Sequence, residues 1–175
     1  MQLLASKLID SSVFSVHAGH NIAKVKTLLV DQKELKICLL VIENNRKQTM
    51  YLQATDIRSI GIINGPCVIV DDEDKLSEKD ELLRHQQIIK EGKSLVGFKV
   101  KTSSGKTIGK VKDMAIDQQD LYILKLHIRA RLHQRFLQSS LLVDRSDIVG
   151  IKKDTIIIKD AFVKTQSTVK KALPA

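Results

Sequence analysis

The chain has 175 residues, of which 43% are hydrophobic and 28% charged, a composition that can fill a packed core and excludes an intrinsically disordered chain. Aromatic residues make up only 3% and tryptophan is absent, so leucine, isoleucine and valine must form the core, which favours strands. No apolar stretch approaches the roughly 18 residues of a membrane-spanning helix, and the N-terminus lacks a signal-peptide pattern. We therefore expect a soluble, cytoplasmic protein.

The net charge of +9 is distributed unevenly along the chain. Residues 1–70 carry a net charge of +3, residues 71–91 carry −4, residues 92–160 carry +7, and residues 161–175 carry +3. Because positive charge accumulates in the second half, we expect an anionic partner there.

An internal repeat organises the chain. Residues 19–35 read GHNIAKVKTLLVDQKEL and residues 105–121 read GKTIGKVKDMAIDQQDL, which align without a gap. Later matches, such as Asp56-Ile57 with Asp147-Ile148, follow after small insertions. The match predicts a duplicated domain.

The expected elements recur in the same order in each copy. In the second copy we predict a hairpin turn at Ser104-Gly105, and strands at 95–102, 106–116, 121–132, 136–143 and 155–160. Short strands without an intervening helix are typical of a small antiparallel barrel. Asp31 and Asp117 follow equivalent strands, and this repetition predicts a role in turn formation rather than acid–base catalysis.

A different segment lies between the copies. Leu76-Ser77 followed by Asp80 predicts a capped helix start, Leu82 and Ile89 its apolar face, and Gly92 its end. The preceding acidic run, residues 71–74, has two interpretations: an intramolecular clamp for a basic face, or a solvated linker near a helix N-terminus. The second is the simpler.

The motif LVGFKVKTSSGKTIGKVKDMAID, followed by an apolar strand, Asp147-Ile148 and TIIIKD, resembles the PRC-barrel domain. That domain occurs in the photosynthetic reaction-centre H subunit and in the ribosome-maturation factor. The first copy is similar through residues 9–16, 19–25 and 56–61, although Ala23 replaces the equivalent of Gly109. The resemblance covers roughly residues 6–160.

The resemblance implies a mainly β fold of two tandem small antiparallel β-barrels joined by a short linker helix. We expect the first PRC-barrel-like domain at 1–71, an acidic linker with the helix at 72–91, the second domain at 92–160, and a basic tail at 161–175. The two copies could pack on each other or form a homodimer, and the sequence does not decide between these arrangements.

The resemblance also implies a non-catalytic binding or assembly module, because the shared motif is a folding motif and transfers no catalytic, cofactor or metal residue. We therefore expect no enzyme activity, and a macromolecular partner, either a protein or ribosomal RNA. The alternative is a peripheral adaptor of a membrane-associated, photosynthesis-type complex, which would contact an anionic membrane surface.

One run of residues is the candidate binding site. Basic and apolar side chains alternate from 125 to 135, so a strand would carry an apolar face and a cationic one. We call the cationic set the basic stripe, and expect it to contact RNA phosphates or another polyanion: Lys125, His127, Arg129, Arg131, His133 and Arg135. The alternative interpretation, without a binding function, is a solvated face whose charge protects an edge strand from aggregation.

The remaining candidates for chemistry are weak. Cys38 and Cys67 lie in apolar runs without metal-ligand spacing, so we expect buried free thiols. His17 and His20 form an HxxH in the first hairpin, but no further ligands lie near them in the sequence. We expect solvated turn histidines there.

Overall fold

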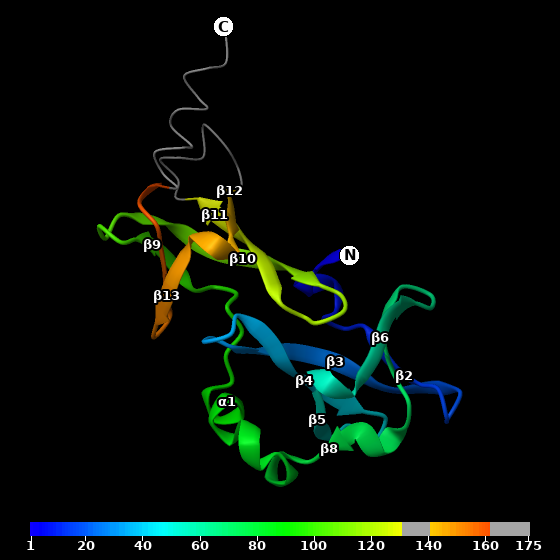
Figure 1. Cartoon of the computed structure of the whole chain (residues 1–175). Coiled ribbons are helices and arrows are strands. Elements are labelled where there is room, and N and C mark those ends of the chain that lie inside the picture. Colours follow the sequence, from blue (N-terminus) through cyan, green and yellow to red (C-terminus); the bar gives the residue numbers. More distant parts are fainter. Residues whose placement is uncertain (131–140, 162–175) are drawn as a thin grey trace, which may run out of the picture. The chain divides into compact units, whose positions relative to one another are not determined.

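The structure, a computed structural model, describes residues 1–130 and 141–161. The protein is mainly β, with two sheets and short helical segments (Figure 1). It divides into two compact units, Met1–Ser94 with Ala115–Ile123, and Leu95–Met114 with Leu124–Ala175. The tip of the second copy's central hairpin, residues 115–123, thus belongs to the first unit.

The first sheet has seven strands in the order β6-β7-β2-β3-β4-β5-β8. Their bounds are β2 (Ser12–Ser15), β3 (His20–Asp31), β4 (Lys36–Asn44), β5 (Thr49–Gln53), β6 (Ile57–Ile62), β7 (Pro66–Val70) and β8 (Leu76–Ser77). Side chains that point to one face along β4 and β5, such as Leu40, Ile42 and Leu52, have no exposed surface. Alternation along the strands therefore forms an aliphatic core, as the lack of aromatic residues requires.

The second sheet has the order β12-β11-β10-β9-β14-β13, and β1 pairs with the far end of β10. The bounds are β1 (Gln2–Leu4), β9 (Lys99–Thr102), β10 (Thr107–Asp117), β11 (Ile123–Ala130), β12 (Leu141–Asp144), β13 (Ile148–Lys152) and β14 (Thr155–Ile158). Strand β1 was not predicted, because its three residues carry no periodic pattern of their own.

Equivalent strands occur in the same order in both sheets, as the internal repeat requires. The closing strand of each copy lies beside the opening strand and runs parallel to it, with Val13 opposite Val68 and Val100 opposite Ile156. The antiparallel prediction is wrong for this pair. It overlooked the edge strand, β6 or β13, that precedes the closing strand. Within the described residues, no ladder joins the two ends of either sheet.

The linker is less helical than the sequence predicts. Leu76-Ser77 forms β8 instead of a helix cap, and 3-10 turns occupy Lys79–Glu81 and Leu83–His85. The α-helix α1 (Gln86–Glu91) has only six residues, and the capping box lies before it, formed by Glu78 and Glu81 at the turn Lys79–Glu81. Gly92 ends α1 in the left-handed conformation, as predicted.

The apolar residues of the linker pack where the sequence suggested. Leu82 and Ile89 are buried against Leu29 of β3 and Leu39 of β4. The linker therefore belongs to the core of the first unit, and its helix is held by burial of these side chains more than by its length.

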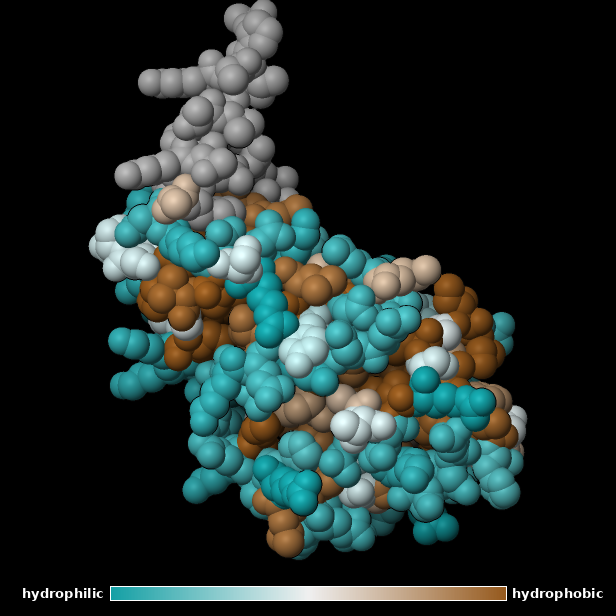
Figure 2. All heavy atoms as spheres, in the orientation of Figure 1, coloured by the Kyte–Doolittle hydropathy of each residue, from teal (hydrophilic) through white to brown (hydrophobic). Residues whose placement is uncertain are grey.

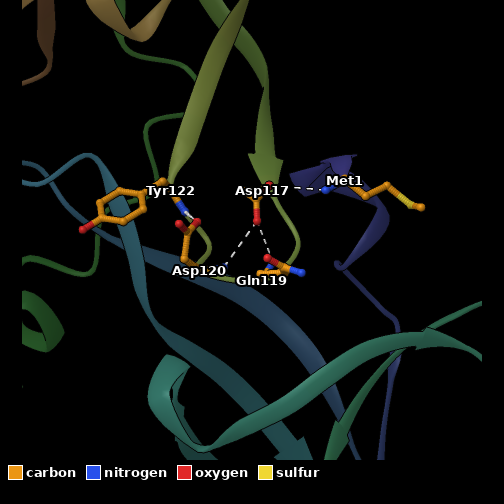
Figure 3. Close-up of polar contacts among 5 residues, drawn as sticks. All are labelled: Met1, Asp117, Gln119, Asp120 and Tyr122. Carbon is orange, nitrogen blue, oxygen red and sulfur yellow. Dashed lines mark hydrogen bonds and ion pairs between the residues drawn. The ribbon is translucent and has the colours of Figure 1, made fainter.

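The two aspartates at equivalent positions form turns, as predicted. The Asp31 carboxylate accepts hydrogen bonds from the backbone N–H groups of Lys33 and Glu34, at 2.8 and 3.2 Å. Asp117 accepts one from Gln119 at 2.7 Å (Figure 3), and this bond holds its pKa below the ordinary value of 3.8. In both turns the carboxylate takes the place of a backbone acceptor.

The same two turns pair with each other inside the first unit. Leu35 and Leu121 both have positive φ, +51° and +59°, which is costly for a residue other than glycine. The backbone N–H of Ile37 donates to the Leu121 oxygen at 3.1 Å, and that of Ile123 donates to the Leu35 oxygen at 2.9 Å. These reciprocal bonds follow the symmetry of the repeat and over-determine the strained conformation.

One glycine is required by a close approach of two strands. A Cβ atom on Gly109 of β10 would collide with the carbonyl group of Arg129 on β11. By contrast, a Cβ atom on Gly150 of β13 would have no heavy atom within 4 Å.

We predict that Gly109→Ala lowers the free energy of unfolding by about 1–3 kcal/mol, because β10 and β11 must move apart. Gly150→Ala is the matched control and should change it by less than about 0.5 kcal/mol. Urea denaturation of both variants measures the difference. Equal effects of the two substitutions would show that the close approach is not a constraint.

Candidate functional site

The basic stripe begins on β11, where the predicted alternation is present. Leu126, Ile128 and Ala130 are buried, with 0%, 0% and 4% of their surface exposed. Between them His127 is half-buried and Arg129 is exposed. Over this part of the strand, one face packs into the second sheet and the other carries the cationic side chains. Arg131, His133 and Arg135 lie outside the described residues.

The first residue of the basic stripe is already neutralised. The Lys125 ammonium group lies 3.6 Å from the Asp144 carboxylate, directly across the ladder between β11 and β12. Arg129 has no such partner among the described residues. The part of the stripe available to an external anion therefore starts beyond Lys125.

Four further lysines share the outer face of the second sheet, and the sequence prediction missed them. Lys99 and Lys101 lie on β9, with buried Val100 between them. Lys110 and Lys112 lie on β10, both exposed, with buried Val111 between them. Their signal in the sequence was the alternation K-V-K in two consecutive strands.

Apolar side chains reach the surface elsewhere. Ile62 at the end of β6 is 85% exposed, and Val149 on the equivalent edge strand β13 is 60% exposed. Figure 2 shows apolar surface over β13 and over the β6–β7 hairpin. These edge positions are distinct from the cationic face.

A hollow of about 300 Å³ opens in the first unit beside the linker. Its wall carries charges of both signs, from Asp31, Lys36 and Arg84, together with Cys38 and His85. The Nδ1 atom of His85 is buried without a hydrogen-bond partner. The mixture of charges gives the hollow no preference for one ligand class.

Cys67 occupies the buried environment that the sequence predicts, whereas Cys38 is less buried than predicted. Cys67 is 1% exposed, Cys38 is half-buried, and both are free. Burial, and then the nearby Asp31 carboxylate, raise the pKa of the Cys38 thiol from 9.0 to about 11. At neutral pH this thiol is protonated and is a poor nucleophile.

The described residues contain no group of three His, Cys, Asp or Glu side chains placed to hold a metal ion. His17 and His20 are both exposed, and His20 Nδ1 lies 3.0 Å from the Ala18 oxygen, as expected for turn histidines. No helix in the described part of the chain is long and apolar enough to cross a membrane.

No protein-family model and no curated protein sequence matches this chain. The arrangement of its own residues is therefore what defines the candidate site.

The raised pKa of Cys38 predicts a dependence of stability on pH. A folded-state pKa above that of the unfolded chain contributes stability that is complete below pH 9.0 and is lost as the pH rises through about 11. The difference in unfolding free energy between the wild-type protein and Cys38→Ala should therefore shrink across this interval. Urea denaturation at several pH values tests it, and a constant difference would contradict the assignment.

Proposed function

We propose that this chain is a non-enzymatic binding module that engages an anionic macromolecule, ribosomal RNA, through the basic stripe. We further propose that each sheet is a PRC-barrel-like domain. The shared strand order of the two sheets and the closing strand beside the opening one support a duplicated small β domain. The sequence motifs at 95–117 and 147–160 support the family assignment.

The observation that carries the functional proposal is the exposed face of β11. Arg129 is exposed and unpaired by any carboxylate of the described residues, while its neighbours Ile128 and Ala130 are buried. Because side chains alternate along a strand, the exposed cations of β11 face one side of the sheet. A phosphate chain can therefore contact them without a rearrangement of the backbone. In the equivalent part of the first copy, β4 carries Glu43 at the position of Arg129.

Contacts to phosphates give a characteristic salt dependence. Each phosphate that a lysine or arginine neutralises releases counterions, so binding weakens steeply as salt is added. The described residues offer no exposed aromatic side chain on this face for base stacking. We therefore expect binding that is sensitive to salt and tolerant of sequence.

We predict that the tagged protein co-sediments with ribosomal particles from a host lysate at low salt and is released at high salt. Arg129→Gln, Arg131→Gln and Arg135→Gln together should move it to the top of the gradient, because about three phosphate contacts are lost. The matched control replaces Lys33, Arg46 and Lys90 by glutamine, which removes the same charge from the first unit. Circular dichroism verifies that both variants fold.

Each alternative has its own outcome in this experiment. Unchanged sedimentation of the stripe variant would exclude the stripe as the site. Protein that stays at the top of the gradient at both salt concentrations would overturn the RNA proposal. Protein that follows the membrane fraction would favour the peripheral adaptor.

A further inference from the structure

The two sheets carry the same scaffold but differ in the charge of one face. We define the lysine face as the outer side of β9, β10 and β11 in the second sheet. It comprises Lys99, Lys101, Lys110, Lys112 and Arg129. In the first sheet the equivalent strands are β2, β3 and β4. The comparison of equivalent positions is therefore an internal control for what the fold itself requires.

Three neighbouring strands of the second sheet place like charges side by side. Lys99 of β9 is directly opposite Lys110 of β10 in the ladder. On the other side of β10, Gly109, the residue before Lys110, closely approaches the carbonyl group of Arg129 on β11. Directly opposed like charges destabilise a sheet. The face therefore keeps an arrangement that works against folding.

No carboxylate in the described part of the chain compensates this face. None of its five cations forms an ion pair with a described residue. Lys125, four residues before Arg129 on β11, does have a counterion in Asp144. The uncompensated charge is thus confined to the lysine face.

In the first sheet the equivalent lysine pair has a counterion. Lys24 and Lys26 of β3 correspond to Lys110 and Lys112, and Glu43 of β4 corresponds to Arg129. Glu43 lies opposite Lys24 in the ladder and 3.5 Å from the Lys26 ammonium group. A hydrogen bond from Lys47, together with Lys26, lowers the pKa of Glu43 below its ordinary value of 4.5. The fold therefore tolerates a counterion at this position.

The opening strands differ in the same sense. Ser12 of β2 pairs with Lys24 as Lys99 of β9 pairs with Lys110, so a serine in the first copy is a lysine in the second. Phe14 corresponds in the same register to Lys101. Three positions of one face have thus gained positive charge in the second copy, and the counterion has been lost.

We propose that the lysine face binds the phosphate backbone of RNA, and that the two copies have diverged so that only the second copy binds. This inference rests on the proposed RNA function and extends its site from β11 to β9 and β10. Lysine acts as a point charge on a flexible stem, so a flat array of lysines fits a chain of phosphates without reading bases. Between the lysines the face carries no exposed apolar side chain that could insert into a membrane.

The test uses the full chain and a fluorescein-labelled duplex RNA of arbitrary sequence, with fluorescence anisotropy as the readout. The face variant carries Lys99→Gln, Lys101→Gln and Lys110→Gln. The matched control carries Lys24→Gln, Lys26→Gln and Lys47→Gln, which removes the same charge from the lysines around Glu43. Five of the six lysines lie on strands and Lys47 lies in the turn between β4 and β5; none of the six is buried, so both variants should fold, and circular dichroism checks this.

We expect the face variant to bind the duplex about tenfold or more weakly and to lower the slope of log affinity against log salt by about 3. The control should stay within about twofold of the wild-type protein, because Glu43 is the counterion of Lys26 and Lys47, and because Ser12 and Phe14 stand where the second copy has Lys99 and Lys101. A face variant within twofold of the wild-type protein, or a control that loses as much as the face variant, would overturn the inference.

A third variant separates this inference from the proposed function. Arg131→Gln, His133→Gln and Arg135→Gln alter only the far part of the basic stripe. If this variant loses RNA binding and the face variant does not, the proposed function stands and the lysine face is excluded. If the wild-type protein binds no RNA, the proposed function and the inference about the lysine face are both overturned. Binding to phosphatidylserine vesicles in the absence of RNA binding would overturn both in favour of a membrane surface.

Discussion

The pairing of β10 between β9 and β11 is the constraint on which the candidate site depends. A strand alternates its side chains between two faces, so once Val100, Val111 and Ile128 enter the core their neighbours must face outward. A shift of one residue in either ladder would bury the cations and expose the core. Gly109 allows the close approach of β10 and β11 that sets this register.

Duplication gives the protein two copies of this arrangement, and the outer face is where they differ. The core positions remain aliphatic in both sheets because both must fill the same space between strands. The outer positions have no such requirement, and there Arg129 of the second copy occupies the position that Glu43 has in the first. The face of the second copy carries repulsion that the fold does not need, whereas the first copy carries a counterion, Glu43, on the same scaffold. Functional sites are expected where residues form a local arrangement that is unfavourable for stability.

The pairing of the two central turns adds a second constraint inside the first unit. Leu35 and Leu121 hold left-handed backbone conformations that a branched side chain avoids, yet both are buried. The reciprocal hydrogen bonds with Ile37 and Ile123 offset that cost, and each depends on the other turn. The Asp31 and Asp117 carboxylates support the turns from within. Equivalent residues of the repeat thus form one structural element.

The sequence pattern was sufficient to predict the elements that are determined by interactions between residues close in the sequence. Alternation predicted the central strands, the repeat predicted two similar sheets, the aspartates predicted the turns, and Gly92 predicted the end of α1. The capping box was misplaced because Leu76-Ser77 finds a strand partner in β5, a competition that no local rule contains. The edge strands β6 and β13 were missed for a similar reason, since each is short and pairs on one side only.

The sequence by itself determined that the chain is a duplicated, mainly β protein and that β11 carries alternating cations. Only the tertiary structure decided which cations stand together, because that depends on the ladder register between strands distant in the sequence. It paired Lys125 with Asp144, and it placed Lys99 opposite Lys110 on the two strands that follow the strand of Arg129 in the sheet. The parallel direction of each closing strand relative to its opening strand was also decided only in the tertiary structure. Charge along a strand follows from the order of residues, whereas charge across a sheet follows from pairing.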